Sequence, residues 1–143
     1  LPAGTLLFDT AGAFSSADYA ALWERGLQRG CSTLSTAEAR LIREHAHRLK
    51  VLDSDSWCTQ AFPDGYGYLA AACVNPHYRG RGVLSALFDP VIARAERLRI
   101  PLCLETYAER SMNIYMHKGF EIIRLTTNRE LGLTQYCMAK LPT

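Results

Sequence analysis

Residues 74–83, with the sequence VNPHYRGRGV, are the most informative segment of this 143-residue chain. An apolar run over 66–74 predicts a buried strand before it, and an amphipathic segment over 81–98 predicts a helix after it. The first N–H groups of a helix lack internal partners and lie at the positive end of the helix dipole. Arg79 and Arg81 add positive charge at this point. The stretch therefore predicts a phosphate-binding loop at the start of a helix.

The glycines in this stretch narrow the kind of loop. Gly80 and Gly82 let the backbone approach a bulky anion without a Cβ in the way. The stretch is not a Walker A loop, which requires G-x-x-x-x-G-K-[ST], and two glycines are too few for the G-x-G-x-x-G dinucleotide pattern. An ordinary glycine-rich turn is the structural alternative.

Outward from the loop, the pattern predicts alternating strands and helices. A second apolar run, over 100–106, follows the predicted helix. The chain therefore contains a strand–helix–strand unit around the loop, which implies a parallel pair of strands with a right-handed crossover. Ser35 and Glu38 have the spacing of a capping box at a helix start. The other expected elements are strands over 5–9, 120–126 and 134–141, helices over 17–29 (stopped by Gly30), 36–51 and 109–118, and a loop over 53–65.

Composition limits the class of protein. The length suits a single domain, and 48% hydrophobic with 21% charged residues is ordinary for a globular chain. A net charge of +2 does not indicate nucleic-acid binding, and no apolar run is long enough for a membrane helix. Five scattered cysteines, with Cys73 and Cys103 inside apolar runs as expected core residues, favour a reducing compartment and hence a cytoplasmic location.

No metal site is expected from the histidines. His45 and His47 are two residues apart on a predicted helix and therefore diverge. His77 lies in the phosphate loop, where contact with solvent or a phosphate is the simpler role.

Two motifs in the second half of the chain resemble the GNAT superfamily of N-acetyltransferases. The loop resembles that family's Q/R-x-x-G-x-G/A loop for the diphosphate of acetyl-CoA, with Arg79, Gly82 and Leu84 at the three fixed positions. Leu84 departs from the expected small residue. Downstream, LET at 104–106 and YMHKGF at 115–120 resemble the family's later motif, especially in the small-molecule branch that includes puromycin N-acetyltransferase.

The resemblance, which covers about residues 66–141, implies a fold and an acetyl-CoA site. The implied fold is α/β, with a GNAT-like mixed central sheet in which two parallel strands splay apart. The backbone near Cys73 and Val74 would hold the pantetheine amide and the thioester oxygen, and Ser111 would replace a cofactor-contacting asparagine of the family. The residues implied for the diphosphate loop are Arg79, Gly80, Arg81, Gly82, Val83 and Leu84.

Two residues are candidates for catalysis. Tyr115 matches the family tyrosine that protonates the departing CoA thiolate, a general-acid role. Its alternative is a core tyrosine with one hydrogen bond. Glu105, at the end of the second splayed strand, is a candidate general base, with a helix-capping or salt-bridging carboxylate as the alternative.

The first half of the chain departs from the family pattern. The family places a strand, two helices and a strand hairpin before the first splayed strand, whereas the 67 residues before Tyr68 predict two helices and at most one strand. The N-terminal strands are therefore expected to be missing from the chain or rebuilt. Missing strands would leave an exposed sheet edge over 66–74, to be covered by a homodimer partner or a swapped segment.

The sequence thus predicts an enzyme that transfers an acetyl group from acetyl-CoA to a primary amine of a small molecule. A protein or peptide amine is an alternative acceptor. A non-catalytic acyl-CoA-binding module with the same fold is a second alternative, and a nucleotide-binding enzyme is a third.

Overall fold

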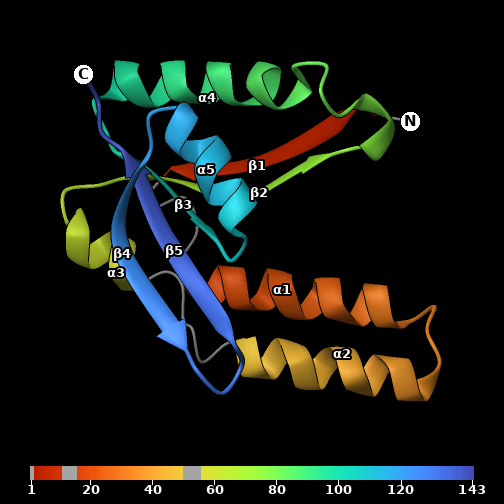
Figure 1. Ribbon diagram of the computed structural model, residues 1–143. Helices are drawn as coiled ribbons and strands as arrows, with labels where there is room; N and C mark the ends of the chain where they lie inside the picture. The colour runs from red at the N-terminus through yellow and green to blue at the C-terminus, as the bar shows by residue number, and fades with distance from the viewer. Residues whose placement is uncertain (1, 11–15, 50–55) are drawn as a thin grey trace. The chain divides into compact units, whose positions relative to one another are not determined.

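The computed structural model describes residues 2–10, 16–49 and 56–143 (Figure 1). The chain forms two compact units. One comprises residues 1–11 and 57–143, and the other comprises residues 12–56. The first unit contains the whole described sheet and the predicted phosphate loop, so it holds the residues predicted to form the functional site.

A five-stranded mixed sheet organises the first unit, with the strand order β1-β2-β3-β5-β4. Its only parallel pair among the described strands is β2 with β3, and the other neighbours are antiparallel. The strands are β1 (Gly4–Thr10), β2 (Gly67–Val74), β3 (Leu102–Thr106), β4 (Glu121–Asn128) and β5 (Leu133–Lys140). The predicted strands are therefore confirmed, with small shifts at their ends.

The parallel strands β2 and β3 separate halfway along. They pair only from Gly67 to Leu69 on β2 and from Leu102 to Leu104 on β3. The pairing of β2 with β1 also changes at this point. Leu69 pairs with Phe8 and Ala71 pairs with Leu7, so that Ala70 has no partner on β1. Such an extra residue is a β-bulge, which bends its strand. The bulge thus coincides with the start of the splay, and Figure 1 shows the strands side by side at their starts and apart at their carboxyl ends.

The splay confirms the fold class, an α/β domain with a mixed central sheet and splayed parallel strands. The predicted exposed edge over 66–74 is wrong. β1 pairs with β2 along its whole length, from Gly4 opposite Val74 to Thr10 opposite Gly67. The TLLFD segment alone did not indicate how far this strand extends or where it pairs.

Helices cover both faces of this sheet. α4 (Val83–Leu98) packs on β1 and β2, and α5 (Glu109–His117) packs on β3. On this face the core comprises Leu69, Phe88, Ala95, Leu102, Leu104, Phe120 and Met138. The other face buries the short helix α3 (Ser56–Ala61) through a cluster of Trp57, Cys58, Cys103, Cys137 and Ala139.

Two of the sequence predictions near this core need correction. Residues 53–65 were expected to form a loop, but α3 lies within them. Trp57 and Cys58 are almost fully buried, so packing on the sheet stabilises a helix too short to be recognised from its polar neighbours. Cys103 is buried as expected, whereas Cys73 is exposed because it lies beyond the bulge, where β3 no longer accompanies β2.

The second unit is a pair of helices, α1 (Ser16–Cys31) and α2 (Thr36–Leu49), which contact each other. The predicted capping box is confirmed, because the Ser35 N–H donates to Glu38 Oε2 at 2.9 Å and the Glu38 N–H donates to Ser35 Oγ at 3.4 Å. The predicted stop at Gly30 is wrong, since α1 includes Gly30 and ends at Cys31, two residues beyond the predicted end. The end of the second predicted helix, at residues 50 and 51, lies outside the described residues. No helix in the described ranges is long and apolar enough to cross a membrane.

Candidate functional site

A short turn prepares the predicted phosphate loop. The 3₁₀ helix η2 (Pro76–Tyr78) follows β2, and Asn75 caps it by accepting the His77 N–H on Oδ1 at 3.1 Å. After it, Gly80 has a φ of +73° and Gly82 has a φ of +76°. These left-handed conformations favour glycine, and together they reverse the chain between η2 and α4.

The loop ends in a set of free backbone donors. Gly82 precedes α4 and offers no side-chain cap, and the first helical bond runs from the Ala86 N–H to Gly82 O at 3.0 Å. The N–H groups of Val83, Leu84 and Ser85 therefore meet no acceptor within the described part of the chain. A Cβ added at Gly80 or Gly82 would have no atom within 4 Å. The approach to these donors is thus open, as an anion site requires.

The arginines of the loop lie at the surface beside these donors. Both Arg79 and Arg81 are exposed. The Arg81 guanidinium lies 5.7 Å from the centre of the Tyr78 ring, within the range of a cation–π contact. His77 is also exposed. The structure therefore brings the predicted loop residues, from Arg79 to Leu84, to the start of one helix.

The end of β2 presents one backbone donor toward the splay. The Asn75 N–H bonds Ala3 O, on the side of β1, at 2.9 Å. Because N–H groups alternate in direction along a strand, the Val74 N–H points away from β1, toward the gap left by β3. The same alternation directs the Cys73 N–H to β1. Cys73 and Val74 were both predicted to bind pantetheine through the backbone. Only Val74 has an N–H that points into the gap between β2 and β3.

Tyr115 lies on α5 beside α4. Its ring stacks on Phe88 with centres 5.6 Å apart, and Phe120 lies 6.1 Å away. Burial raises the pKa of Tyr115 above its usual value of 10, and the electrostatic interaction with Cys73 raises it further. The phenol therefore keeps its proton at neutral pH. Its hydroxyl makes no hydrogen bond with any residue in the described ranges.

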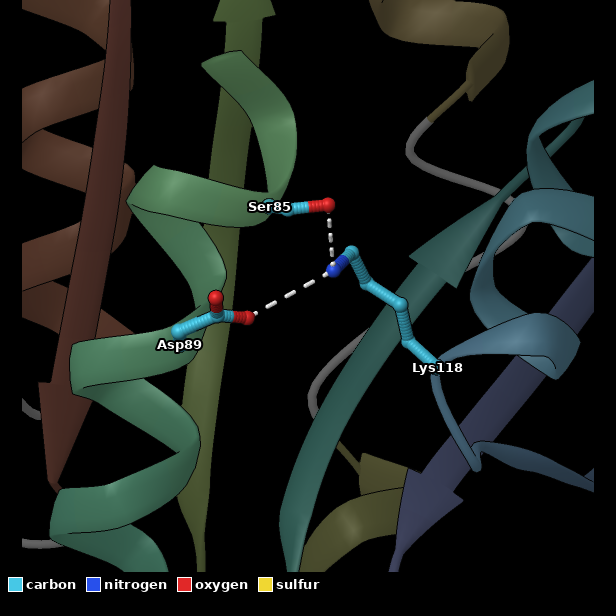
Figure 2. Close-up of polar contacts among 3 residues, drawn as sticks. All are labelled: Ser85, Asp89 and Lys118. Atoms are coloured by element: carbon cyan, nitrogen blue, oxygen red, sulfur yellow. Dashed lines mark hydrogen bonds and ion pairs between the residues drawn. The ribbon is translucent and has the colours of Figure 1, made fainter. Parts of the chain in front are cut away.

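Lys118 ties the end of α5 to the first turns of α4 (Figure 2). Its Nζ donates to Ser85 Oγ at 3.0 Å and lies 3.6 Å from Asp89 Oδ1. The same ammonium lies 5.8 Å from the centre of the Phe88 ring, and the lysine side chain is only 16% exposed. Lys118 thus links the helix that carries Tyr115 to the helix that begins at the phosphate loop. No local sequence pattern indicates this role of Lys118, because Lys118 and Ser85 are 33 positions apart.

Ser111 occupies the first turn of α5. It is half-buried, and its N–H donates to Ala108 O at 2.9 Å. Its hydroxyl makes no hydrogen bond within the described ranges, so it is free to meet a ligand.

Glu105 lies on the opposite face of the sheet from Tyr115. It is the first residue of β3 past the last pair with β2. The Trp57 Nε1–H donates to Glu105 Oε1 at 2.7 Å, and Gln135 Nε2 donates to Oε2, also at 2.7 Å. Two N–H donors thus hold the two oxygens of the Glu105 carboxylate in place. The structure therefore does not bring the two catalytic candidates onto one face, and they flank the splay from either side.

Neither hydrogen-bond partner of Glu105 was predicted from the sequence. Trp57 lies in the stretch that was expected to be a loop, and Gln135 lies in the last strand, among apolar neighbours. The signal that could have indicated Gln135 is a polar amide in the middle of the predicted strand over 134–141.

Buried thiols surround this carboxylate. Burial raises the pKa of Cys137 to about 11, with a further rise from Glu105 and an opposing effect of Arg124. The pKa of Cys58 is also raised, first by its hydrogen bond with Cys103 and then by burial. Burial and the Glu105 charge raise the pKa of Tyr107 in the same way. These thiols and this phenol are therefore neutral at physiological pH.

The raised pKa of Cys137 predicts a loss of stability in alkali. An unfolded chain ionises this thiol near 9, whereas the folded chain holds the proton to about 11. The stabilisation is fully present below pH 9 and is lost as the pH rises from 9 to 11. Urea unfolding across this range is expected to give a shallower decline in the free energy of unfolding for Cys137→Ala than for the wild type. An equally steep decline in the variant would contradict the assignment.

No family model matches the sequence. Solved structures that resemble part of the chain are acetyltransferases. One, from Corynebacterium glutamicum, is described as histone acetyltransferase HPA2 and related acetyltransferase. Its sequence is 29% identical to this chain, the match covers 55% of this chain and 42% of that protein, and the TM-score is 0.48. A NatC complex bound to Gag peptide and CoA is 23% identical over 55% of this chain and 52% of its own, with a TM-score of 0.48.

A third similar structure is Chaetomium thermophilum Naa20 in complex with a bisubstrate analogue. It is 17% identical over 55% of this chain and 47% of its own, with a TM-score of 0.48. The chain therefore spans about half the length of the solved proteins it matches.

Proposed function

We propose that this chain transfers an acetyl group from acetyl-CoA to a primary amine of a small molecule. The observation that carries the proposal is the open loop at the end of a splayed strand pair. β2 leaves β3 after Leu69, and the chain then turns through Gly80 and Gly82 into a helix start with free N–H donors. A long ligand with an anionic diphosphate at one end suits this combination of a gap and an anion site.

The residues around the gap suit acetyl-CoA as the donor substrate. The amides of Val83 and Leu84, with Arg79 and Arg81, would bind the diphosphate. The Val74 N–H would hold the pantetheine arm or the thioester oxygen, where a fixed donor stabilises the oxyanion of the tetrahedral intermediate. Tyr115 would stand on the α4 and α5 face of the gap, with Glu105 on the other face.

The proposed reaction uses these residues as follows. The lone pair of a neutral amine attacks the thioester carbonyl carbon, the carbon–sulfur bond breaks, and the CoA thiolate leaves. Tyr115 donates its phenolic proton to that sulfur, and the nitrogen gives up one proton to Glu105, directly or through water. The products are the acetylated amine and CoA, and solvent restores both side chains. Burial raises the pKa of Tyr115, and it would raise the pKa of the CoA thiol in the same surroundings as well. The two pKa values would therefore stay close, so that the proton transfer from phenol to sulfur is neither strongly uphill nor strongly downhill.

Ligand binding and thiol release together test the proposal. Acetyl-CoA at 100 times its Kd is expected to stabilise the fold by about 2.7 kcal/mol. Thiol release should then depend on an added amine. The panel should contain small primary amines, peptides with a free N-terminus and peptides whose only amine is a lysine side chain.

Each outcome of this experiment has a distinct meaning. Turnover with small amines above that with peptides supports the proposal. Turnover only with peptides would replace the acceptor and keep the acetyl transfer. Tight CoA binding with no transfer to any amine would indicate a non-catalytic acyl-CoA-binding module, and absence of CoA binding would remove the acetyl-CoA site.

A further inference from the structure

Gln135 has a buried oxygen atom that no hydrogen-bond donor among the described residues meets. Its side chain is completely buried on β5. Nε2 donates to Glu105 Oε2 at 2.7 Å and lies 3.4 Å from the Tyr107 hydroxyl, whereas Oε1 has no hydrogen-bond partner in the described structure. A buried acceptor without a partner costs about 1–3 kcal/mol, so such atoms are rare in folded proteins.

The orientation of this amide follows from its neighbour. Turning the side chain by 180° would place Oε1 against the carboxylate oxygen of Glu105, and two acceptors at 2.7 Å repel each other. Nε2 therefore faces Glu105, and Oε1 is the atom left over. Because Trp57 holds the other carboxylate oxygen at 2.7 Å, the Glu105–Gln135 pair is fixed on both sides.

Glu105 lies at the open end of the splay, and Gln135 reaches it from β5, on the other side of β3 from β2. Glu105 follows the last residue of β3 that pairs with β2, and Gln135 lies on the adjacent strand, beyond the residues of β5 that face β3. Tyr107, at the outer end of the network, is 40% exposed, so the network extends from the buried amide to the surface. The carboxylate at the point where β3 leaves β2 thus has the Gln135 amide beside it, on the neighbouring strand β5.

We propose that Glu105 and Gln135 form the subsite for the acceptor nitrogen, and that Gln135 selects primary over secondary amines. This inference rests on the proposed function. A neutral primary amine carries two N–H bonds. One proton leaves to Glu105 as the carbon–nitrogen bond forms, and the other remains in the product amide, where it donates to Gln135 Oε1. A secondary amine retains no N–H after the first proton leaves, so Oε1 stays without a partner.

The test compares matched amines in the wild-type protein and in variants. The wild type is expected to favour a primary amine over its N-methyl derivative by about 10-fold or more in kcat/KM, the scale of leaving one buried acceptor unpaired. Gln135→Leu has a similar volume but no polar atoms, and it should lower this ratio toward one while leaving KM for acetyl-CoA unchanged. Tyr107→Phe, which removes a hydroxyl from the same network, should keep the ratio.

A second variant guards against misfolding of the first. Gln135→Glu keeps the shape, and its protonated form retains both a donor toward Glu105 and a carbonyl acceptor. The preference for primary amines should therefore return in this variant as the pH falls. If Gln135→Leu folds and transfers acetyl groups with the wild-type ratio, or if the wild type shows no preference, the subsite assignment is overturned and the proposed function stands. If the wild type transfers to no amine, both are overturned.

Discussion

Replacing Tyr115 by phenylalanine is expected to lower kcat by about 100-fold or more, the usual contribution of a general acid. The substitution removes only the hydroxyl, which bonds no residue in the described ranges. The ring would still stack on Phe88 and contact Phe120, so the fold and the phosphate loop should persist. The Kd for CoA should therefore stay within a few-fold of the wild-type value. Steady-state kinetics and calorimetric titration with CoA measure the two quantities.

Tyr136→Phe is the matched control, because Tyr136 is a partly buried tyrosine that packs against the same core. Its loss of a hydroxyl should leave kcat nearly unchanged. A Tyr115→Phe protein with wild-type turnover across the pH range would mean that Tyr115 is a core tyrosine, the alternative that its sequence position also allowed. A variant that loses CoA binding as well would indicate a structural defect instead.

Local patterns in the sequence predicted most of the first unit. The apolar run over 66–74 and the glycines at 80 and 82 specify a strand, a turn with left-handed residues and a helix start, and each step depends only on neighbours in sequence. Ser35 and Glu38 likewise form their capping box within a single turn. Such features are predictable because the residues that stabilise them are a few positions apart.

The features that were missed depend on residues far apart in the chain. α3 forms because Trp57 packs under β3 and β5, and Gln135 reaches Glu105 across two adjacent strands, 30 positions away in sequence. The bulge at Ala70 exists only as a register shift against β1. No periodicity of hydrophobic residues encodes these pairings, since they depend on which strands become neighbours.

Gly82→Val is expected to raise the Kd for CoA by about 10- to 100-fold. Gly82 has a φ of +76°, and a β-branched residue held in that conformation carries a strain of about 1–3 kcal/mol. Residue 82 would relieve the strain by adopting a negative φ. This change would turn the N–H groups of Val83 and Leu84 away from one another, so that they no longer point at the same anion. An added side chain would also occupy the open space where the diphosphate is proposed to lie. Calorimetric titration with CoA gives the Kd directly.

Gly132→Val separates this effect from a general loss of stability. Gly132 has a φ of +61° and equally open surroundings, but it connects β4 and β5 far along the chain from the loop. Both variants should therefore lower the free energy of unfolding by a similar amount, and only Gly82→Val should weaken CoA binding. Equal CoA affinity in the two variants would show that the amides at the start of α4 do not bind the diphosphate. The acetyl-CoA site would then lose the one contact on which its location depends.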